Sequence, residues 1–327
     1  MDKRFDKVLE EINKGNKFLV VSHVNPEGDA VGSTIGLALA LKELGKDVTP
    51  YLEDQVPAVY SFLPGVDLVT NKVESDDWYD AVFAVDCGKM ERLGKGFEKI
   101  VNRGIIINID HHTTNDHFGD INIIEPNACA AGELIYDLLN AASIKITRDI
   151  AVNLYVAIHT DTGSFKYSAS TPEAFRKAGE LVALGADPWE ISQHVYESYP
   201  LKRIKLLTHV LETLELADGG KIASMVITRN LLNRFQAKDD LVEGFVNYAR
   251  AIEGVEVALL FKETDAGEYK VSFRSKGNIN VADVASSFGG GGHVNASGCN
   301  IRGSLELVKE QVIGAIEGSI RSKRLAN

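Results

Sequence analysis

Short apolar runs alternate with longer stretches of helical spacing through the first half of the chain. Buried strands are predicted at residues 18–21, 48–52, 81–85 and 105–109. Helices are predicted at residues 28–44, 127–139 and 150–159. Strands that alternate with helices are typical of a parallel, doubly wound α/β sheet, so we expect this fold for the N-terminal domain. In such sheets, ligands bind at the carboxyl ends of the strands.

The pattern changes in the second half of the chain. Residues 171–217 have the spacing of several helices. Beyond them, strands are predicted at residues 222–227, 255–261 and 269–273, and helices at residues 239–252, 281–288 and 305–319. The expected organisation is a first domain at residues 1–195, a helical linker at residues 196–217 and a smaller α/β domain at residues 218–327.

Composition narrows the class of partner. The 327 residues carry 35 Lys and Arg against 46 Asp and Glu, a net charge of −11. Long duplex nucleic acid and anionic membranes are bound through clustered cations, so this balance disfavours both, whereas a local pocket can still hold a small anionic ligand. The three cysteines form no CxxC pair, and no run reaches the length of a membrane span. We therefore expect reduced thiols and a cytoplasmic location.

Carboxylates and imidazoles follow four separate predicted elements. The segments are residues 23–29, Asp86, residues 110–112 and Asp161. Each alone has an ordinary explanation, such as a helix cap for Asp29 or a turn for an Asp at the end of a strand. Because all four segments are expected at one edge of one sheet, a shared site explains them better than coincidence.

The chemistry of this set favours divalent metal ions. Clustered carboxylates repel one another and raise each other's pKa, and bound cations remove that repulsion. Oxygen ligands with imidazoles and no thiolate suit Mn²⁺ or Mg²⁺ better than structural Zn²⁺. The number of ligands exceeds what one catalytic ion needs, so two ions that share a carboxylate fit better. Such a pair activates water against a phosphoester or phosphoanhydride.

The same residues resemble the motifs of the DHH phosphoesterase superfamily. The matching segments are residues 23–33, Asp86, residues 110–112 and residues 161–165. Residues 289–298, with the run Gly289-Gly-Gly-Gly-His293, resemble the glycine-rich signature of the DHH-associated C-terminal domain. A two-domain chain of this length is most similar to the nano-RNase/pAp phosphatase branch. That branch degrades very short oligonucleotides and dephosphorylates 3′-phosphoadenosine 5′-phosphate (pAp).

The resemblance implies a role for each residue. The first metal ion would bind His23, Glu27 and Asp86, and the second would bind Asp29, Asp86, His111 and Asp161. His112 would face the scissile phosphate and stabilise the charge that develops there. Asp110 would orient His111 and fix its tautomer.

Substrate binding is expected from the C-terminal domain. The expected residues are Arg274, Ser275, Gly290, Gly291, Gly292 and His293. A glycine run lets backbone N–H groups approach a phosphate, and an arginine fork binds a phosphate in bidentate fashion. The small residues at 128–132 also open a helix whose N–H groups could contact a phosphate, although ordinary packing explains them equally well.

One proposed metal ligand departs from the family pattern. The family usually has Asp where this chain has Glu27, whose carboxylate is one methylene further from the backbone. We expect the loop that carries Glu27 to adjust to the longer side chain.

The resulting hypothesis is a Mn²⁺-dependent phosphodiesterase and phosphatase, in which a metal-activated hydroxide cleaves short RNA or DNA oligonucleotides and pAp. The alternatives are a cyclic-dinucleotide phosphodiesterase and a nucleotide-binding sensor with attenuated activity. A homodimer is left open.

Overall fold

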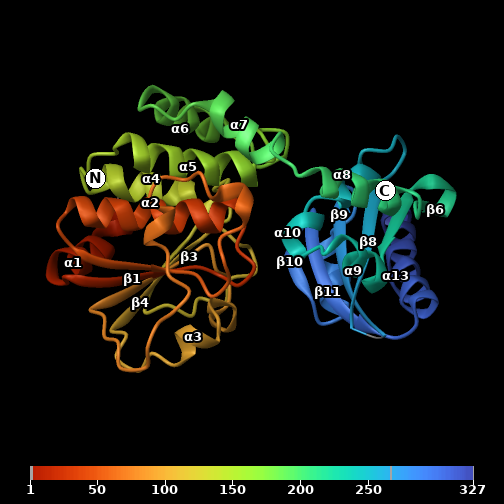
Figure 1. Ribbon diagram of the computed structural model, residues 1–327, viewed down its shortest axis with the longest axis horizontal. Helices are drawn as coiled ribbons and strands as arrows, with labels where there is room; N and C mark the ends of the chain where they lie inside the picture. Colours follow the sequence, from red (N-terminus) through yellow and green to blue (C-terminus); the bar gives the residue numbers. More distant parts are fainter. Residues whose placement is uncertain (1–2, 266, 327) are drawn as a thin grey trace. The chain divides into compact units, whose positions relative to one another are not determined.

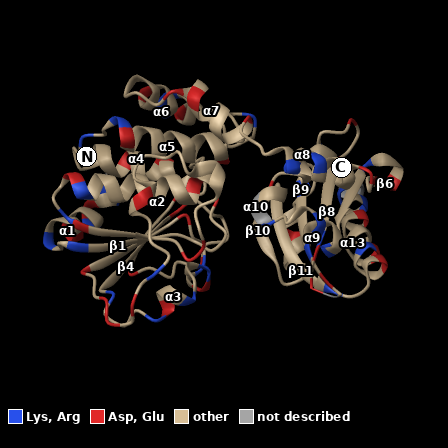
Figure 2. Cartoon of the chain, in the orientation of Figure 1, with Lys and Arg blue, Asp and Glu red and all other residues tan. Residues whose placement is uncertain are grey.

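The computed structural model describes residues 3–265 and 267–326. The chain forms two compact units, Met1–Ser198 and Tyr199–Asn327, each built around its own sheet (Figure 1). Lys and Arg are interspersed with Asp and Glu along the helices of both units (Figure 2). In the described part of the chain, no helix has both the length and the apolar character that a membrane span requires.

The first unit contains a parallel five-stranded sheet in the order β2-β1-β3-β4-β5. Its strands are β1 (Lys17–Val21), β2 (Asp47–Tyr51), β3 (Ala81–Val85), β4 (Ile105–Asp110) and β5 (Ile121–Ile124). The central strands read as continuous apolar runs because both of their faces are buried. The expected α/β fold is confirmed. The edge strand β5 was not predicted, because Asn122 interrupts its short apolar run and three of its four residues are only half-buried.

Helices cover both faces of this sheet. Figure 1 shows α2, α4 and α5 on one face, with α6 and α7 beyond them, and α3 on the other face. The bounds are α1 (Asp6–Lys14), α2 (Gly28–Glu43), α3 (Lys95–Glu98), α4 (Ala131–Ala141), α5 (Arg148–Asp161), α6 (Pro172–Ala183) and α7 (Pro188–Tyr196). Helix α5 packs against α2, α4 and α6. Glycines let the backbones approach closely, since a Cβ added to Gly32 would lie 2.4 Å from the carbonyl oxygen of Asn153.

The second unit contains a mixed six-stranded sheet in the order β10-β11-β9-β8-β7-β6. The strands are β6 (Glu215–Ala217), β7 (Ile222–Ile227), β8 (Val257–Asp265), β9 (Glu268–Ser275), β10 (Gly291–His293) and β11 (Ala296–Arg302). The helices are α8 (Leu201–Leu211), α9 (Arg229–Phe235), α10 (Asp239–Val242), α11 (Val246–Arg250), α12 (Val281–Ser287) and α13 (Leu305–Ala326). Separate apolar clusters fill the two faces of the sheet.

One local prediction for the second unit was wrong. The helix expected at residues 239–252 is broken into α10 and α11, because Gly244 between them has a φ of +75°. Residues 291–293, at the end of the glycine run, form β10, which pairs antiparallel with β11 and was not predicted as a strand. Residues 196–217, expected as a helical linker, contain α8 and also β6, which pairs with β7. The domain limits at residues 195 and 217 stay a prediction.

Candidate metal centre

The carboxyl ends of the parallel strands bring the predicted donors to one edge of the first sheet. Strand β1 runs into the turn that carries His23 and Glu27, and β3 ends directly before Asp86. Strand β4 ends at Asp110, with His111 and His112 next along the chain. Asp29 lies in the first turn of α2, and Asp161 is the last residue of α5.

His23, Glu27 and Asp86 form the first group of donors. The Nε2 atom of His23 lies 3.3 Å from Oε2 of Glu27 and 3.4 Å from Oδ2 of Asp86. The other ring nitrogen, Nδ1, lies 2.8 Å from the carbonyl oxygen of Val24 and 3.1 Å from a guanidinium nitrogen of Arg92. When Nδ1 donates its proton to Val24, the Nε2 lone pair is directed toward the two carboxylates.

His111, Asp29 and Asp161 form the second group. The Nε2 atom of His111 lies 3.7 Å from Oδ2 of Asp29, 3.5 Å from Oδ2 of Asp161 and 3.5 Å from Oδ1 of Asp86. Its Nδ1 atom lies 3.2 Å from the carbonyl oxygen of Ala128, which suits donation there and leaves Nε2 as a ligand. Asp86 thus presents one carboxylate oxygen to each group.

This donor set fits divalent metal ions. Ligands around an octahedral ion at about 2.1 Å stand about 3 Å apart, close to the separations found here. The Oδ1 atom of Asp86 is buried and has no hydrogen-bond partner among the described residues, which is costly unless a cation lies beside it. In the groups His23, Glu27, Asp86 and Asp29, His111, Asp161, the ligand atoms lie within 4.8 Å of one another, and Asp86, Asp110 and His112 are equally close.

The electrostatics follow from packing carboxylates and imidazoles together. Burial and the neighbouring Asp86 hold the pKa of Asp29 well above its usual range. Burial also raises the pKa of Asp161 to about 6, with repulsion from Asp86 adding to it. Burial acts against the imidazolium forms, but the carboxylates outweigh it and hold the pKa values of His23 and His111 well above normal. The metal-free cluster therefore retains protons that bound cations would displace.

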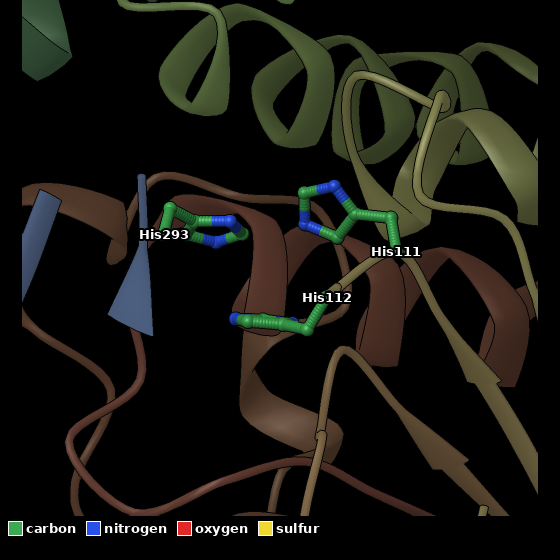
Figure 3. Close-up of side chains that lie close together, drawn as sticks. All are labelled: His111, His112 and His293. Atoms are coloured by element: carbon green, nitrogen blue, oxygen red, sulfur yellow. The ribbon is translucent and has the colours of Figure 1, made fainter. Parts of the chain in front are cut away.

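The expected role of Asp110 is corrected by its hydrogen bonds. Asp110 was expected to orient His111, but its Oδ1 atom lies 2.7 Å from Nδ1 of His112. Residues two apart on an extended chain project to the same side, whereas adjacent residues project to opposite sides. Figure 3 shows the rings of His111 and His112, which follow β4 directly. Their ring planes are 67° apart and their centroids are 5.1 Å apart.

Two residues that sequence reasoning missed hold this carboxylate and its surroundings. Asn115 donates from Nδ2 to Oδ2 of Asp110 at 2.6 Å and to the side-chain oxygen of Asn108 at 2.8 Å. Asn108 in turn donates to the carbonyl oxygens of Ala84 and Cys87. Neither asparagine follows a recognisable spacing, so no sequence signal pointed to them, nor to Arg92 beside His23.

Asp29 is held from two directions. Its Oδ1 atom accepts from the Ser33 hydroxyl at 2.7 Å and from the N–H of Gly132 at 3.0 Å. Its Oδ2 atom accepts from the N–H of Ala131 at 2.6 Å. The start of α4 therefore binds this carboxylate, and the suggestion that these N–H groups contact a phosphate was wrong.

The longer side chain at residue 27 is accommodated at the start of α2. Glu27 is the N-cap residue, and its Oε1 atom accepts a long hydrogen bond of 3.4 Å from the N–H of Ala30. Its other oxygen, Oε2, faces His23. The side chain thus folds back, capping the helix while it presents one oxygen to the first group.

Arg274 and His293 share one face of the second sheet. Ala296 of β11 is the register partner of both Arg274 in β9 and His293 in β10. Directly opposed residues project to the same side, so the small Ala296 side chain separates the two longer ones. Adjacent strands lie about 4.8 Å apart, which places the two Cα positions about 10 Å apart. Arg274 also donates from Nη1 to the carbonyl oxygen of Phe273 at 2.9 Å.

The other residues expected to bind substrate have mainly structural contacts. Ser275 is buried, and its hydroxyl accepts from the N–H of Gly277 at 3.0 Å. Gly290 has no space for a side chain, since an added Cβ would lie 2.1 Å from the carbonyl oxygen of Gly298. Gly292 has a φ of +138° and is similarly crowded by Ala296. Gly291 pairs with Gly298 and has open space around its Cα.

Comparison with known families matches both halves of the chain. The N-terminal domain of the DHH family matches residues 17–158, and the DHHA1 domain matches residues 219–321. A bifunctional oligoribonuclease and PAP phosphatase NrnA from Thermus thermophilus is 33% identical over 298 residues, covering 91% of this chain and 88% of that protein. A protein of the same description from Bacillus subtilis is 26% identical and covers 90% of this chain and 92% of its own length.

Solved structures share the fold. An exopolyphosphatase-related protein from Bacteroides fragilis has a TM-score of 0.87 and 27% identity, and the match covers 99% of this chain and 98% of that one. RecJ from Thermus thermophilus in complex with Mn²⁺ has a TM-score of 0.56 and 16% identity, covering 96% of this chain and 55% of that one. The similarity to RecJ concerns the fold alone.

Proposed function

The chain belongs to the DHH family and is a hydrolytic enzyme, and from this premise we propose that it cleaves short RNA or DNA oligonucleotides and pAp with two divalent metal ions. The observation that carries the proposal is the position of Asp86 between two groups of donors. Its Oδ2 atom lies 3.4 Å from His23 of the first group, and its Oδ1 atom lies 3.5 Å from His111 of the second. The names of the relatives at 33% and 26% identity support the substrate class.

The donor set identifies which residues would hold the ions. His23, Glu27 and Asp86 would bind the first ion, and Asp29, Asp86, His111 and Asp161 the second. Bound Mn²⁺ or Mg²⁺ would supply Lewis acidity toward the phosphoryl oxygens and an activated water for attack on phosphorus. We propose Mn²⁺, since an oxygen-rich set with two imidazoles suits it well.

The remaining residues bind and orient the substrate. Asp110 holds the proton of His112 on Nδ1, so Nε2 is the ring nitrogen left to face the scissile phosphate in this proposal. Burial lowers the pKa of His112, but Asp110 and Asp86 outweigh burial and raise it. A cationic His112 would stabilise the negative charge that develops as the bond to phosphorus breaks.

Arg274 and His293 bind a terminal phosphate of the substrate in this proposal. Their common face and the small residue between them suit a group with several acceptor oxygens. A site that recognises one end of the nucleotide favours short substrates, because a long strand presents few ends per unit length. The acidic composition is consistent with this preference over long duplexes.

The direct test compares substrates in one experiment. Purified protein with Mn²⁺ is incubated with labelled RNA from a dinucleotide up to long oligomers, with pAp and with cyclic di-AMP, and Asp86→Asn serves as the inactive control. We expect mononucleotide release to be fastest from the shortest RNA, together with cleavage of pAp. Cleavage of the cyclic dinucleotide alone would assign a signalling substrate instead. Tight nucleotide binding without turnover would indicate a sensor.

A further inference from the structure

The turn that starts α4 contacts two of the proposed metal ligands. The carbonyl oxygen of Ala128 lies 3.2 Å from Nδ1 of His111. The N–H groups of Ala131 and Gly132 donate to the carboxylate of Asp29 at 2.6 and 3.0 Å. Both contacted residues belong to the second group of donors. The position of this turn therefore determines how Asp29 and His111 are directed toward a metal ion.

Glu133 holds this turn in place. Its Oε2 atom accepts from the N–H of Cys129 at 2.8 Å, between the two ends of the turn. Its Oε1 atom accepts from Nζ of Lys177 in α6 at 2.8 Å, and Lys177 also lies 2.7 Å from Asp137. Glu133 is 6% exposed and Lys177 is 4% exposed, so solvent screens this ion pair weakly.

The cost of burying these charges argues against a purely stabilising role. Two charges removed from water lose hydration, and apolar residues of similar size are often as stabilising as the buried pair. The carboxylate is nevertheless kept ionised. Burial raises the pKa of Glu133, but Lys177 and the N–H of Cys129 lower it overall. An ionised Glu133 holds the Cys129 N–H more strongly than a neutral acceptor would.

We propose that Glu133, fixed by Lys177, is a positioning residue for the His111 half of the metal centre. It fixes the turn at residues 128–132, and through this turn it sets the direction of Asp29 and His111. The His23 half is oriented separately by Val24 and Arg92, so it is expected to be independent of Glu133. The inference rests on the proposed function, because it assumes that both halves bind a metal ion.

The test measures the two metal-binding steps in the full chain. The variant Glu133→Gln retains an amide oxygen for the Cys129 N–H but removes the charge, and Lys177→Met removes the partner. Mn²⁺ titrations followed by calorimetry and electron paramagnetic resonance should show one step weakened by about 10–100-fold, as for other partners that orient a ligand. The second step should stay within about twofold of the wild type. kcat should fall, with little change in KM.

Ile135→Val supplies the matched control for stability. Ile135 is buried on the same helix, and losing one methylene lowers the melting temperature without removing any of the hydrogen bonds described for the turn. Its metal affinities should equal those of the wild type at a comparable melting temperature. If Glu133→Gln fails to fold, Lys177→Met decides, since Glu133 then keeps its charge and its bond to Cys129 but loses its anchor.

The outcomes separate this inference from the function on which it rests. Wild-type Mn²⁺ affinities in both Glu133→Gln and Lys177→Met, with only a lower melting temperature, would overturn the positioning role and leave the metal centre intact. Equal weakening of both steps would also overturn it, because the effect would not be confined to the His111 half. A wild-type protein that binds no pair of Mn²⁺ ions would refute the metal centre itself.

Discussion

Asp86 directly follows β3 in the left-handed backbone region, with a φ of +52°, and directs its two carboxylate oxygens toward different histidines. This conformation costs a non-glycine residue about 1–2 kcal/mol, and Asp tolerates it better than most. The turn lets a single side chain contact both donor groups at the end of β3. The residue thereby links two sites whose other donors come from different elements.

Glu27 is expected to be a tolerated variation. Glu27→Asp should keep the cap of α2, because Asp is also a preferred N-cap residue, and should change Mn²⁺ affinity and kcat by no more than about threefold. Glu27→Gln removes the charge that faces His23 and should weaken one Mn²⁺ step by about 10–100-fold. Calorimetric titration with Mn²⁺ measures both. A tenfold gain in Mn²⁺ affinity or kcat for Glu27→Asp would instead show that Glu27 weakens the metal site.

Metal binding should depend on pH in a defined direction. His23 and His111 have raised pKa values, and that of Asp161 is about 6, so the metal-free site holds protons near neutrality. Ligands bind metal only after losing these protons, so affinity should rise with pH by about tenfold per pH unit for each proton released. Calorimetry between pH 6 and 8, in two buffers of different ionisation enthalpy, counts the protons. Identical heats in the two buffers would contradict this expectation.

At the scale of elements, successive side chains at the end of β4 project to alternate sides of the chain. His111 turns toward the second donor group, whereas Asp110 and His112 share the other side of the chain and bond to each other. A strand end thus separates a metal ligand from a hydrogen-bonded Asp–His pair without any intervening residue. The motif depends on extended geometry, and a helical segment would not separate these side chains in the same way.

The contact between α2 and α5 gives a prediction about stability. The backbones approach at Gly32, so Gly32→Ala should destabilise the first unit by overpacking, at a cost of about 1–3 kcal/mol. This exceeds the roughly 0.5–1 kcal/mol that Ala gains over Gly within a helix. Urea unfolding measures the change. Gly179→Ala in α6, where an added Cβ meets nothing within 4 Å, should be stabilising.

At the scale of the whole molecule, the proposed tasks are divided between two units with separate cores. All six proposed metal-binding residues lie in Met1–Ser198, whereas Arg274 and His293 lie in Tyr199–Asn327. Each unit has a hydrophobic cluster on its own sheet. Substitutions in the second unit are therefore expected to affect substrate binding without changing metal affinity.

Arg274→Ala tests this division. Losing a bidentate contact to a phosphate should raise KM for a dinucleotide by at least about tenfold, consistent with a charged hydrogen bond worth about 1.5–3 kcal/mol. Mn²⁺ affinity should equal that of the wild type. Arg302→Ala is the control, because Arg302 lies in the same sheet with an 85% exposed side chain. An unchanged KM for Arg274→Ala would remove Arg274 from the proposed phosphate site.

Much of the fold and of the donor set was predictable because it depends on the order of elements along the chain. Buried parallel strands produce apolar runs, and their shared direction brings Asp86 and residues 110–112 to one edge without knowledge of any contact. The sequence therefore determined the α/β class and which side chains gather at the candidate centre. It also identified the glycine-rich signature, although it did not predict that residues 291–293 form a strand.

Only the tertiary structure decided how these side chains are held. Asp29 is bound by N–H groups more than one hundred positions later in the sequence, and Lys177 reaches Glu133 from another helix. Arg92 contacts His23 from a short 3₁₀ helix, Met90–Leu93, that no motif marks. Such contacts depend on the packing of helices against the sheet and on the exact turn at each strand end. The spacing of apolar residues predicts neither the packing nor the turns, because it shows which face of an element is buried and not what lies against that face.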